Sequence, residues 1–325
     1  MPEKRENIIE IKDLRKYYKV KTERLFDRPR YLHAVDGVDL AIRKGETLGI
    51  VGESGCGKST LGHMVLRLRK PTAGTVSYEG FPKGPDRSQM KEFREKFQII
   101  FQDPYSSLNP KKRIGWLLQE PLVIHGIGKD AAERRKLAVN MLREVGMDES
   151  YMEKFPRELS GGQRQRISIG IAMIMNPDFI VADEPVSALD VSVQAQILNL
   201  MKELQEKHGL TWMFISHDLN VVHYISDRIG VMYLGKIVEI GNVEEVYQDP
   251  KHPYTKALLS SIPDLDAGPK EHEIIEGDVP SAVDPGPGCA FASRCKYATE
   301  RCRKETPVLK DIGGRKVSCV LCGSE

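Results

Sequence analysis

The chain has 325 residues, of which 40% are hydrophobic and 29% charged, and its formal net charge is +2. This composition is typical of a folded soluble protein, and the length predicts about two domains. The nearly neutral charge provides no global basic field that would indicate nucleic-acid binding. No segment reaches the roughly 18 consecutive apolar residues that a membrane-spanning helix requires, and the charged N-terminus lacks a signal-peptide core. We therefore expect a cytosolic protein in which clustered thiols act as metal ligands rather than disulfides.

The clearest local pattern is GESGCGKST at positions 52–60, which fits the phosphate-loop consensus G-x-x-x-x-G-K-[ST]. The apolar run 47–51 predicts a buried strand before it, and the apolar spacing of 61–68 predicts a helix after it. In that context backbone N–H groups and the helix N-terminus face phosphate oxygens. The alternative is a glycine-rich turn that binds no ligand, and the predicted strand and helix on either side disfavour it. Lys58 is expected to reach the β- and γ-phosphates, and the Ser59 hydroxyl is expected to bind Mg²⁺. The other residues of this loop predicted to contact the nucleotide are Ser54, Gly55, Cys56, Gly57 and Thr60, with Cys56 acting through its backbone.

Three further apolar runs end in polar residues suited to nucleotide hydrolysis. They cover residues 97–101, 179–182 and 212–216, and they are followed by Gln102, by Asp183 with Glu184, and by His217. In an open parallel α/β sheet, ligands bind beyond the carboxyl ends of the strands. Together with the strand before the phosphate loop, these runs predict that a lysine, a glutamine, two carboxylates and a histidine reach one region.

Each of these residue types has a task in that region. Asp183 can hold Mg²⁺ directly or through water. Neighbouring strand residues point to opposite faces, so Glu184 is expected to polarise the attacking water instead. Gln102 can contact metal and water, and His217 can hydrogen-bond the γ-phosphate. A lone histidine or Asp-Glu pair is usually structural or solvated, so the prediction depends on the four strand ends together.

The segment LSGGQ, residues 159–163, stands before a predicted helix. Ser160 is a natural N-cap, and Gly162 is part of a glycine pair that exposes backbone N–H groups. This pattern predicts a second anion site in the same chain. We expect a head-to-tail dimer in which each LSGGQ closes over the nucleotide of its partner.

With these motifs in this order, the chain resembles the ATP-binding subunits of ABC transporters. The resemblance spans roughly residues 8–245 and includes the D-loop SALD at 187–190. It implies an α/β phosphate-loop NTPase core with an N-terminal antiparallel β-subdomain, in a nucleotide-binding domain at 1–245. It also implies ATP hydrolysis between two sandwiched subunits, identical or different, that drives transmembrane permease subunits from the cytoplasmic face of the membrane.

Two further expectations come from this resemblance. An aromatic side chain of the β-subdomain stacks on adenine in this family, and Tyr17 and Tyr18 are the candidates, with Tyr18 favoured by its spacing from Leu14. A helical subdomain at about 103–165 receives the permease, and apolar periodicity predicts helices at 114–125 and 131–145.

The remaining residues, 246–325, are predicted to form a loop-rich extension. The run His-Pro-Tyr-Thr at 252–255, the turn Gly-Asp-Val-Pro-Ser at 277–281 and the pattern Gly-Cys-x-Phe-x-x-Arg-Cys at 288–295 resemble the C-terminal extension of oligopeptide and dipeptide importer ATPases. The resemblance implies peptide import, with a substrate-binding protein as an indirect partner and no nucleic acid. An importer of nickel or another small solute is the alternative. A soluble ABC ATPase is disfavoured because the chain has one phosphate loop and one LSGGQ.

Five of the six cysteines lie in this extension. Cys289, Cys295, Cys302 and Cys319 are spaced more widely than the paired cysteines of structural zinc sites, which suits an iron–sulfur cluster at least as well. The resemblance implies a [4Fe-4S] cluster, with zinc or free thiols as alternatives. Cys319 is the expected fourth ligand, and Cys322 remains the alternative.

Overall fold

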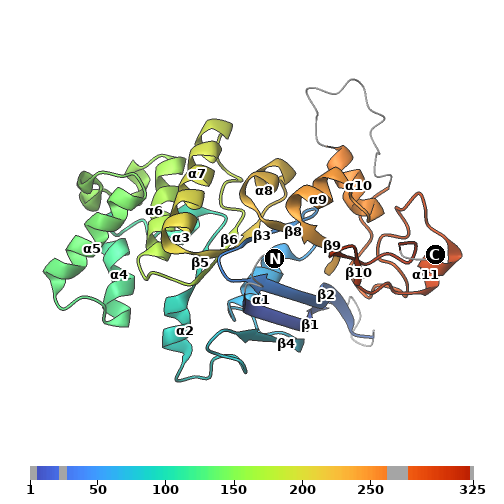
Figure 1. Ribbon diagram of the computed structural model, residues 1–325. Helices are drawn as coiled ribbons and strands as arrows, with labels where there is room; N and C mark the ends of the chain where they lie inside the picture. The colour runs from blue at the N-terminus through green and yellow to red at the C-terminus, as the bar shows by residue number, and fades with distance from the viewer. Residues whose placement is uncertain (1–5, 22–27, 262–276, 323–325) are drawn as a thin grey trace. The chain divides into compact units, whose positions relative to one another are not determined.

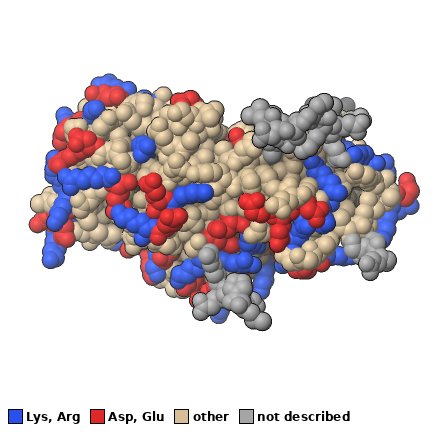
Figure 2. Space-filling model, turned by 45° about the horizontal axis from the view of Figure 1, so that its top comes forward, with Lys and Arg blue, Asp and Glu red and all other residues tan. Residues whose placement is uncertain are grey.

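The computed structural model describes residues 6–21, 28–261 and 277–322. The chain divides into two compact units, which are described separately below. The first contains residues 1–43, 47–83 and 215–325, and the second contains residues 44–46 and 84–214. In the described part of the chain, no helix has the length and apolar character needed to cross a membrane. Lysines and arginines intermingle with aspartates and glutamates over the face shown in Figure 2.

The first unit carries two sheets and the helices that pack on them (Figure 1). Its strands and helices are β1 (Asn7–Val20), β2 (Arg30–Arg43), β3 (Thr47–Val51), α1 (Lys58–Val65), β4 (Ala73–Tyr78), α8 (Leu219–Ile225), β8 (Arg228–Tyr233), β9 (Lys236–Asn242), α9 (Val243–Gln248), α10 (Pro253–Ser260), α11 (Glu300–Lys304), β10 (Lys310–Ile312) and β11 (Arg315–Val317).

The predicted antiparallel β-subdomain is present as a three-stranded sheet in the order β2-β1-β4. β1 is the central strand, and Ile11 pairs with Leu40 on one side and with Val76 on the other. Ile9, Ile11 and Leu14 of β1 are buried, so one face of this sheet supplies part of the core.

The other strands of the first unit follow the order β10-β11-β9-β8-β3. β3 is parallel to β8, and every residue of β3 is buried, as expected for a strand covered on both faces. The hairpin β10–β11 extends this order, because Val317 of β11 pairs with Glu239 of β9. Backbone hydrogen bonds thus join the described part of the extension to the ATPase sheet. The sequence analysis, which expected only a loop-rich extension, did not predict this pairing.

The second unit contains the helices of the predicted helical subdomain and three strands. Its elements are α2 (Met90–Lys96), β5 (Phe97–Ile100), α3 (Pro104–Ser107), α4 (Ile114–His125), α5 (Ala131–Glu144), the 3-10 helices Glu149–Glu153 and Pro156–Glu158, α6 (Gly161–Met173), β6 (Phe179–Asp183), α7 (Val191–His208) and β7 (Thr211–Ile215). The strand order is β7-β6-β5, with β5 parallel to β6.

Local sequence explains where these helices begin and end. Asp130 and Asp190 accept backbone hydrogen bonds at the N-termini of α5 and α7. Gly126 and Gly209 end α4 and α7 in the left-handed conformation that glycine adopts without strain. The predicted helix at 114–125 is confirmed, and the one at 131–145 ends one residue earlier, at Glu144.

Candidate ATP site and cysteine site

The phosphate loop curls between β3 and α1 as its sequence predicts. Gly52 and Gly57 both have positive φ, at 151° and 108°. A Cβ at Gly52 would lie 2.1 Å from the carbonyl oxygen of Met232, and one at Gly57 would lie 2.0 Å from that of Ala34. Both positions therefore require glycine for conformation and for space.

Lys58 is the first residue of α1, and its side chain is buried beneath the loop. Its Nζ donates hydrogen bonds to the carbonyl oxygens of Gly52, at 2.7 Å, and Glu53, at 3.1 Å. The ammonium group thus lies inside the curve of the loop and is hydrogen-bonded to backbone carbonyl oxygens of the loop itself. Cys56 is buried, and its carbonyl oxygen accepts a hydrogen bond from Gly235 N at 2.9 Å. Its backbone is therefore built into the loop, and burial raises the pKa of its thiol.

The second unit brings together two of the predicted hydrolytic residues. Gln102, just beyond β5, donates from Nε2 to Oε2 of Glu184 at 2.9 Å. Asp183 is the last residue of β6 and is buried. Glu184 follows the strand with a φ of 48°, so strand alternation does not explain why it differs from Asp183. The turn that begins at Glu184 determines its direction instead, and Ser187 Oγ donates to the Glu184 carbonyl oxygen at 3.0 Å.

Helix α6 begins at Gly161, within the LSGGQ segment rather than after it as expected. Ser160 is the N-cap, where its hydroxyl accepts from Gln163 N and its own N–H donates to the Gln163 side chain. A Cβ at Gly162 would lie 2.4 Å from Val193 Cγ1, so close packing also requires glycine here. This packing requirement could not be read from the chain's linear pattern.

His217 belongs to the first unit together with Lys58 and Ser59. It is exposed and stands in the turn that follows β7. Ser216 N donates to Ile50 O at 3.1 Å, and Asp218 caps α8 on the other side. The turn is therefore held at both ends, and His217 lies exposed between them.

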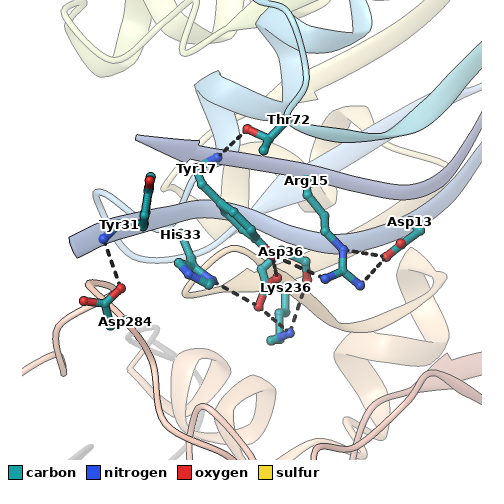
Figure 3. Close-up of polar contacts among 9 residues, drawn as sticks. All are labelled: Asp13, Arg15, Tyr17, Tyr31, His33, Asp36, Thr72, Lys236 and Asp284. Atoms are coloured by element: carbon teal, nitrogen blue, oxygen red, sulfur yellow. Dashed lines mark hydrogen bonds and ion pairs between the residues drawn. The ribbon is translucent and has the colours of Figure 1, made fainter. Parts of the chain in front are cut away.

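The two tyrosines proposed for adenine stacking differ in their surroundings. The Tyr17 ring stacks on His33 with centroids 3.9 Å apart, and its hydroxyl donates to Asp36 (Figure 3). Asp36 also pairs with Lys236 at 2.8 Å. Burial opposes ionisation of Asp36, but the hydrogen bonds from Lys236 and Tyr17 outweigh it and lower its pKa. Tyr18 is half-buried and has Lys16 Nζ 5.1 Å from its ring centroid.

The extension gathers its cysteines around a small cavity. The residues that line it are His252, Pro253, Cys289, Phe291, Ala292, Cys295, Cys302, Cys319, Val320 and Leu321. Burial raises the pKa of the Cys289 thiol to about 11, and the nearby Cys319, Cys295 and Cys302 thiols add to this shift. The four predicted thiols therefore share one apolar site.

Cys322 does not line this cavity. Its Sγ donates to Lys251 O at 3.6 Å, and burial raises its pKa to about 11. Among the described residues, no three or more histidines, cysteines, aspartates or glutamates are grouped as they would be around one metal ion. The metal site expected from the sequence is thus not seen among the described residues.

The sequence analysis did not single out Glu239, which joins the extension to strand β9 within the first unit. Glu239 of β9 is fully buried, and its two carboxylate oxygens accept the backbone N–H groups of Lys251 and His252, each at 2.9 Å. His252 in turn caps α10 by accepting from Tyr254 N at 3.1 Å, and burial lowers the pKa of its imidazole to about 4. The available signal in the sequence was Glu239 itself, a charged residue between the apolar Val238 and Ile240 of β9.

Comparison with known proteins agrees with this arrangement. The ABC transporter family model matches residues 35–187, and the model for the oligopeptide/dipeptide transporter C-terminal region matches residues 238–302. The fold and site thus define an ABC-type ATPase. An ATP-binding cassette solved as a dimer in a post-hydrolysis state with ADP and Pi is 32% identical, with a TM-score of 0.64, and the match covers 72% of this chain and 98% of that one.

Two curated relatives are similar over nearly the whole chain. The dipeptide transport ATP-binding protein DppF of Haemophilus influenzae is 48% identical, and the match covers 94% of each chain. The oligopeptide transport ATP-binding protein AppF of Bacillus subtilis is 46% identical, and the match covers 97% of this chain and 98% of that one. The chain belongs to the dipeptide and oligopeptide transport ATP-binding proteins of the ABC transporter family, and it is an ATPase. This confirms the predicted family and fold.

Proposed function

We propose that this chain hydrolyses ATP to energise the import of dipeptides or oligopeptides through an ABC transporter. The observation that carries the proposal is the similarity to named peptide-transport ATP-binding proteins over both the ATPase region and the extension. The chain acts from the cytoplasmic face of the membrane, where it binds the permease subunits. A substrate-binding protein, an indirect partner of this chain, delivers the peptide to those permease subunits.

The phosphate loop binds the nucleotide in this proposal. Backbone N–H groups of residues 54–60 and Lys58 Nζ bind the phosphates, for which Lys58 exchanges its present contacts with Gly52 and Glu53. Ser59, Asp183 and Gln102 hold Mg²⁺. The ring of Tyr18 stacks on adenine, since the hydroxyl and ring of Tyr17 are already engaged with Asp36 and His33.

Hydrolysis uses Glu184 as the group that polarises water. The amide of Gln102 holds its carboxylate, and His217 contacts the γ-phosphate. Ser160 and Gly162 complete the site of a second, identical or related, subunit in a head-to-tail dimer. The capped N-terminus of α6 supports this role, because such a terminus favours bound anions.

The extension holds a [4Fe-4S] cluster through Cys289, Cys295, Cys302 and Cys319. The shared apolar cavity supports this set of ligands. The cluster stabilises a region rich in loops. Iron, sulfide and zinc analysis of anaerobically purified protein tests this. One zinc per chain without iron would refute the cluster.

Reconstitution with the cognate permease and substrate-binding protein tests the function. Radiolabelled dipeptides and tripeptides should accumulate in vesicles when ATP is supplied to this chain, and uptake should stop in Glu184→Gln. Nickel uptake is measured in parallel. Uptake of nickel with no peptide uptake would favour the small-solute alternative and refute peptide import.

A further inference from the structure

An ion pair within the first unit joins the phosphate loop to the cysteine-bearing extension. Arg294 Nη1 lies 2.9 Å from Glu53 Oε2, and Arg294 Nη2 lies 3.2 Å from Glu53 Oε1. The Arg294 side chain is 7% exposed and that of Glu53 is 25% exposed. Such a paired arrangement of a guanidinium and a carboxylate fixes orientation as well as distance.

Glu53 is held at its backbone as well as at its carboxylate. Its N–H donates to the hydroxyl of Tyr254 at 3.0 Å, and its carbonyl oxygen accepts from Lys58 Nζ at 3.1 Å. Tyr254 is fully buried in α10 of the extension. One loop residue therefore contacts two residues of the extension and the lysine expected to bind phosphate.

The position of Arg294 is set by the cysteine region. It immediately precedes Cys295, and the nearby Phe291 packs against Tyr233 with ring centroids 5.3 Å apart. Arg294 Nη1 is also 3.4 Å from the Tyr233 hydroxyl. Cys295 and Phe291 both line the cysteine cavity, so the same turn forms the thiol site and presents the guanidinium to the phosphate loop.

We propose that Arg294 is a positioning residue for ATP binding, which holds the phosphate loop in its binding conformation through Glu53. The extension is then part of the nucleotide site rather than a separate appendage. This inference rests on the proposed function, which assigns ATP to the phosphate loop. A loop ordered before ATP arrives loses less conformational entropy on binding, so the contact acts on affinity.

The test measures binding of a fluorescent ATP analogue with Mg²⁺ to the full-length chain. Arg294→Gln and Glu53→Gln should each raise the Kd about tenfold, which is the size expected for losing a hydrogen-bonded charged contact. Arg294→Lys should give an intermediate Kd, because it keeps the charge without the paired donors. The double variant should bind no more weakly than either single variant, since both remove the same contact.

Arg301→Gln is the matched control, because the exposed Arg301 of α11 pairs with the exposed Glu305, which caps the end of that helix. Its Kd should equal that of the parent chain. Iron content and thermal unfolding are measured for every variant. An Arg294→Gln protein that loses iron or stability but binds the analogue within about twofold of the parent would overturn the proposal, because that pattern is purely structural.

Additive effects in the double variant would also overturn it, because the two residues would then act by separate routes. If Arg294→Gln does not fold, Glu53→Gln carries the test, since it leaves every residue of the extension unchanged. The parent chain and Lys58→Ala separate the two proposals. A parent chain that does not bind the analogue refutes the nucleotide assignment. If the parent chain binds it, Lys58→Ala binds it more weakly and Glu53→Gln binds it like the parent, only the role of Arg294 is refuted.

Discussion

Gln102 donates a hydrogen bond to the carboxylate of Glu184, with 2.9 Å between Nε2 and Oε2. The contact joins the residues that follow two adjacent parallel strands, β5 and β6. Because Glu184 leaves its strand with a positive φ, the hydrogen bond and the turn at Ser187 together set the direction of the carboxylate.

Replacement of Glu184 by glutamine is expected to separate binding from hydrolysis. The ATPase rate should fall by about 10²- to 10³-fold, because an amide does not polarise water as a carboxylate does. The Kd for ATP should change less than about threefold. Steady-state phosphate release and equilibrium binding measure the two quantities. Glu203→Gln, on the exposed side of α7, is the control, and an unchanged ATPase rate in Glu184→Gln would contradict the assignment.

The adjacent tyrosines of β1 provide a matched pair for the adenine site. Tyr18→Ala should raise the Kd for ATP by about tenfold, since base–aromatic stacking contributes about 1–3 kcal/mol. Tyr17→Phe should leave this Kd unchanged and lower the free energy of unfolding by about 1 kcal/mol, because it removes the hydrogen bond to Asp36. Nucleotide titration and chemical denaturation make these measurements. The reverse pattern would assign adenine to Tyr17.

Glu239→Gln is expected to weaken the attachment of the extension. The buried carboxylate accepts two backbone N–H groups, and a glutamine would turn its own N–H₂ toward one of them. The free energy of unfolding should fall by about 1–3 kcal/mol, as measured by denaturation. Glu244→Gln is the control, because Glu244 is exposed and contacts His223 at the surface. Equal stability of Glu239→Gln and the parent chain would disprove this role.

The two neighbouring cysteines near the C-terminus should differ in their effect on metal content. Cys319→Ser is expected to lose most of the iron, since Cys319 lines the shared cavity, whereas Cys322→Ser should retain it. Iron and sulfide analysis after anaerobic purification decides between them. If Cys319→Ser retains its iron and Cys322→Ser loses it, the fourth ligand is reassigned to Cys322.

Short-range patterns predicted much of this molecule. The buried strand 47–51 and the helix 114–125 were placed with the bounds that the structure shows. In each case the information is local, because an apolar run or a helical period depends only on nearby residues. The hairpin at 310–317 was not predicted, since three-residue strands are too short to display alternation, although Gly313-Gly314 was a turn signal.

The amino-acid sequence by itself determined the family and the ATPase activity, and it singled out the four cysteines that line one cavity, because each of these depends on residue types at fixed spacing. Only the tertiary structure decided what those residues contact. It engages Tyr17 with Asp36, directs Glu184 by a turn rather than a strand, and sets Arg294 against Glu53 from 241 positions away. Such contacts depend on the packing of distant segments, and local periodicity carries no information about that packing.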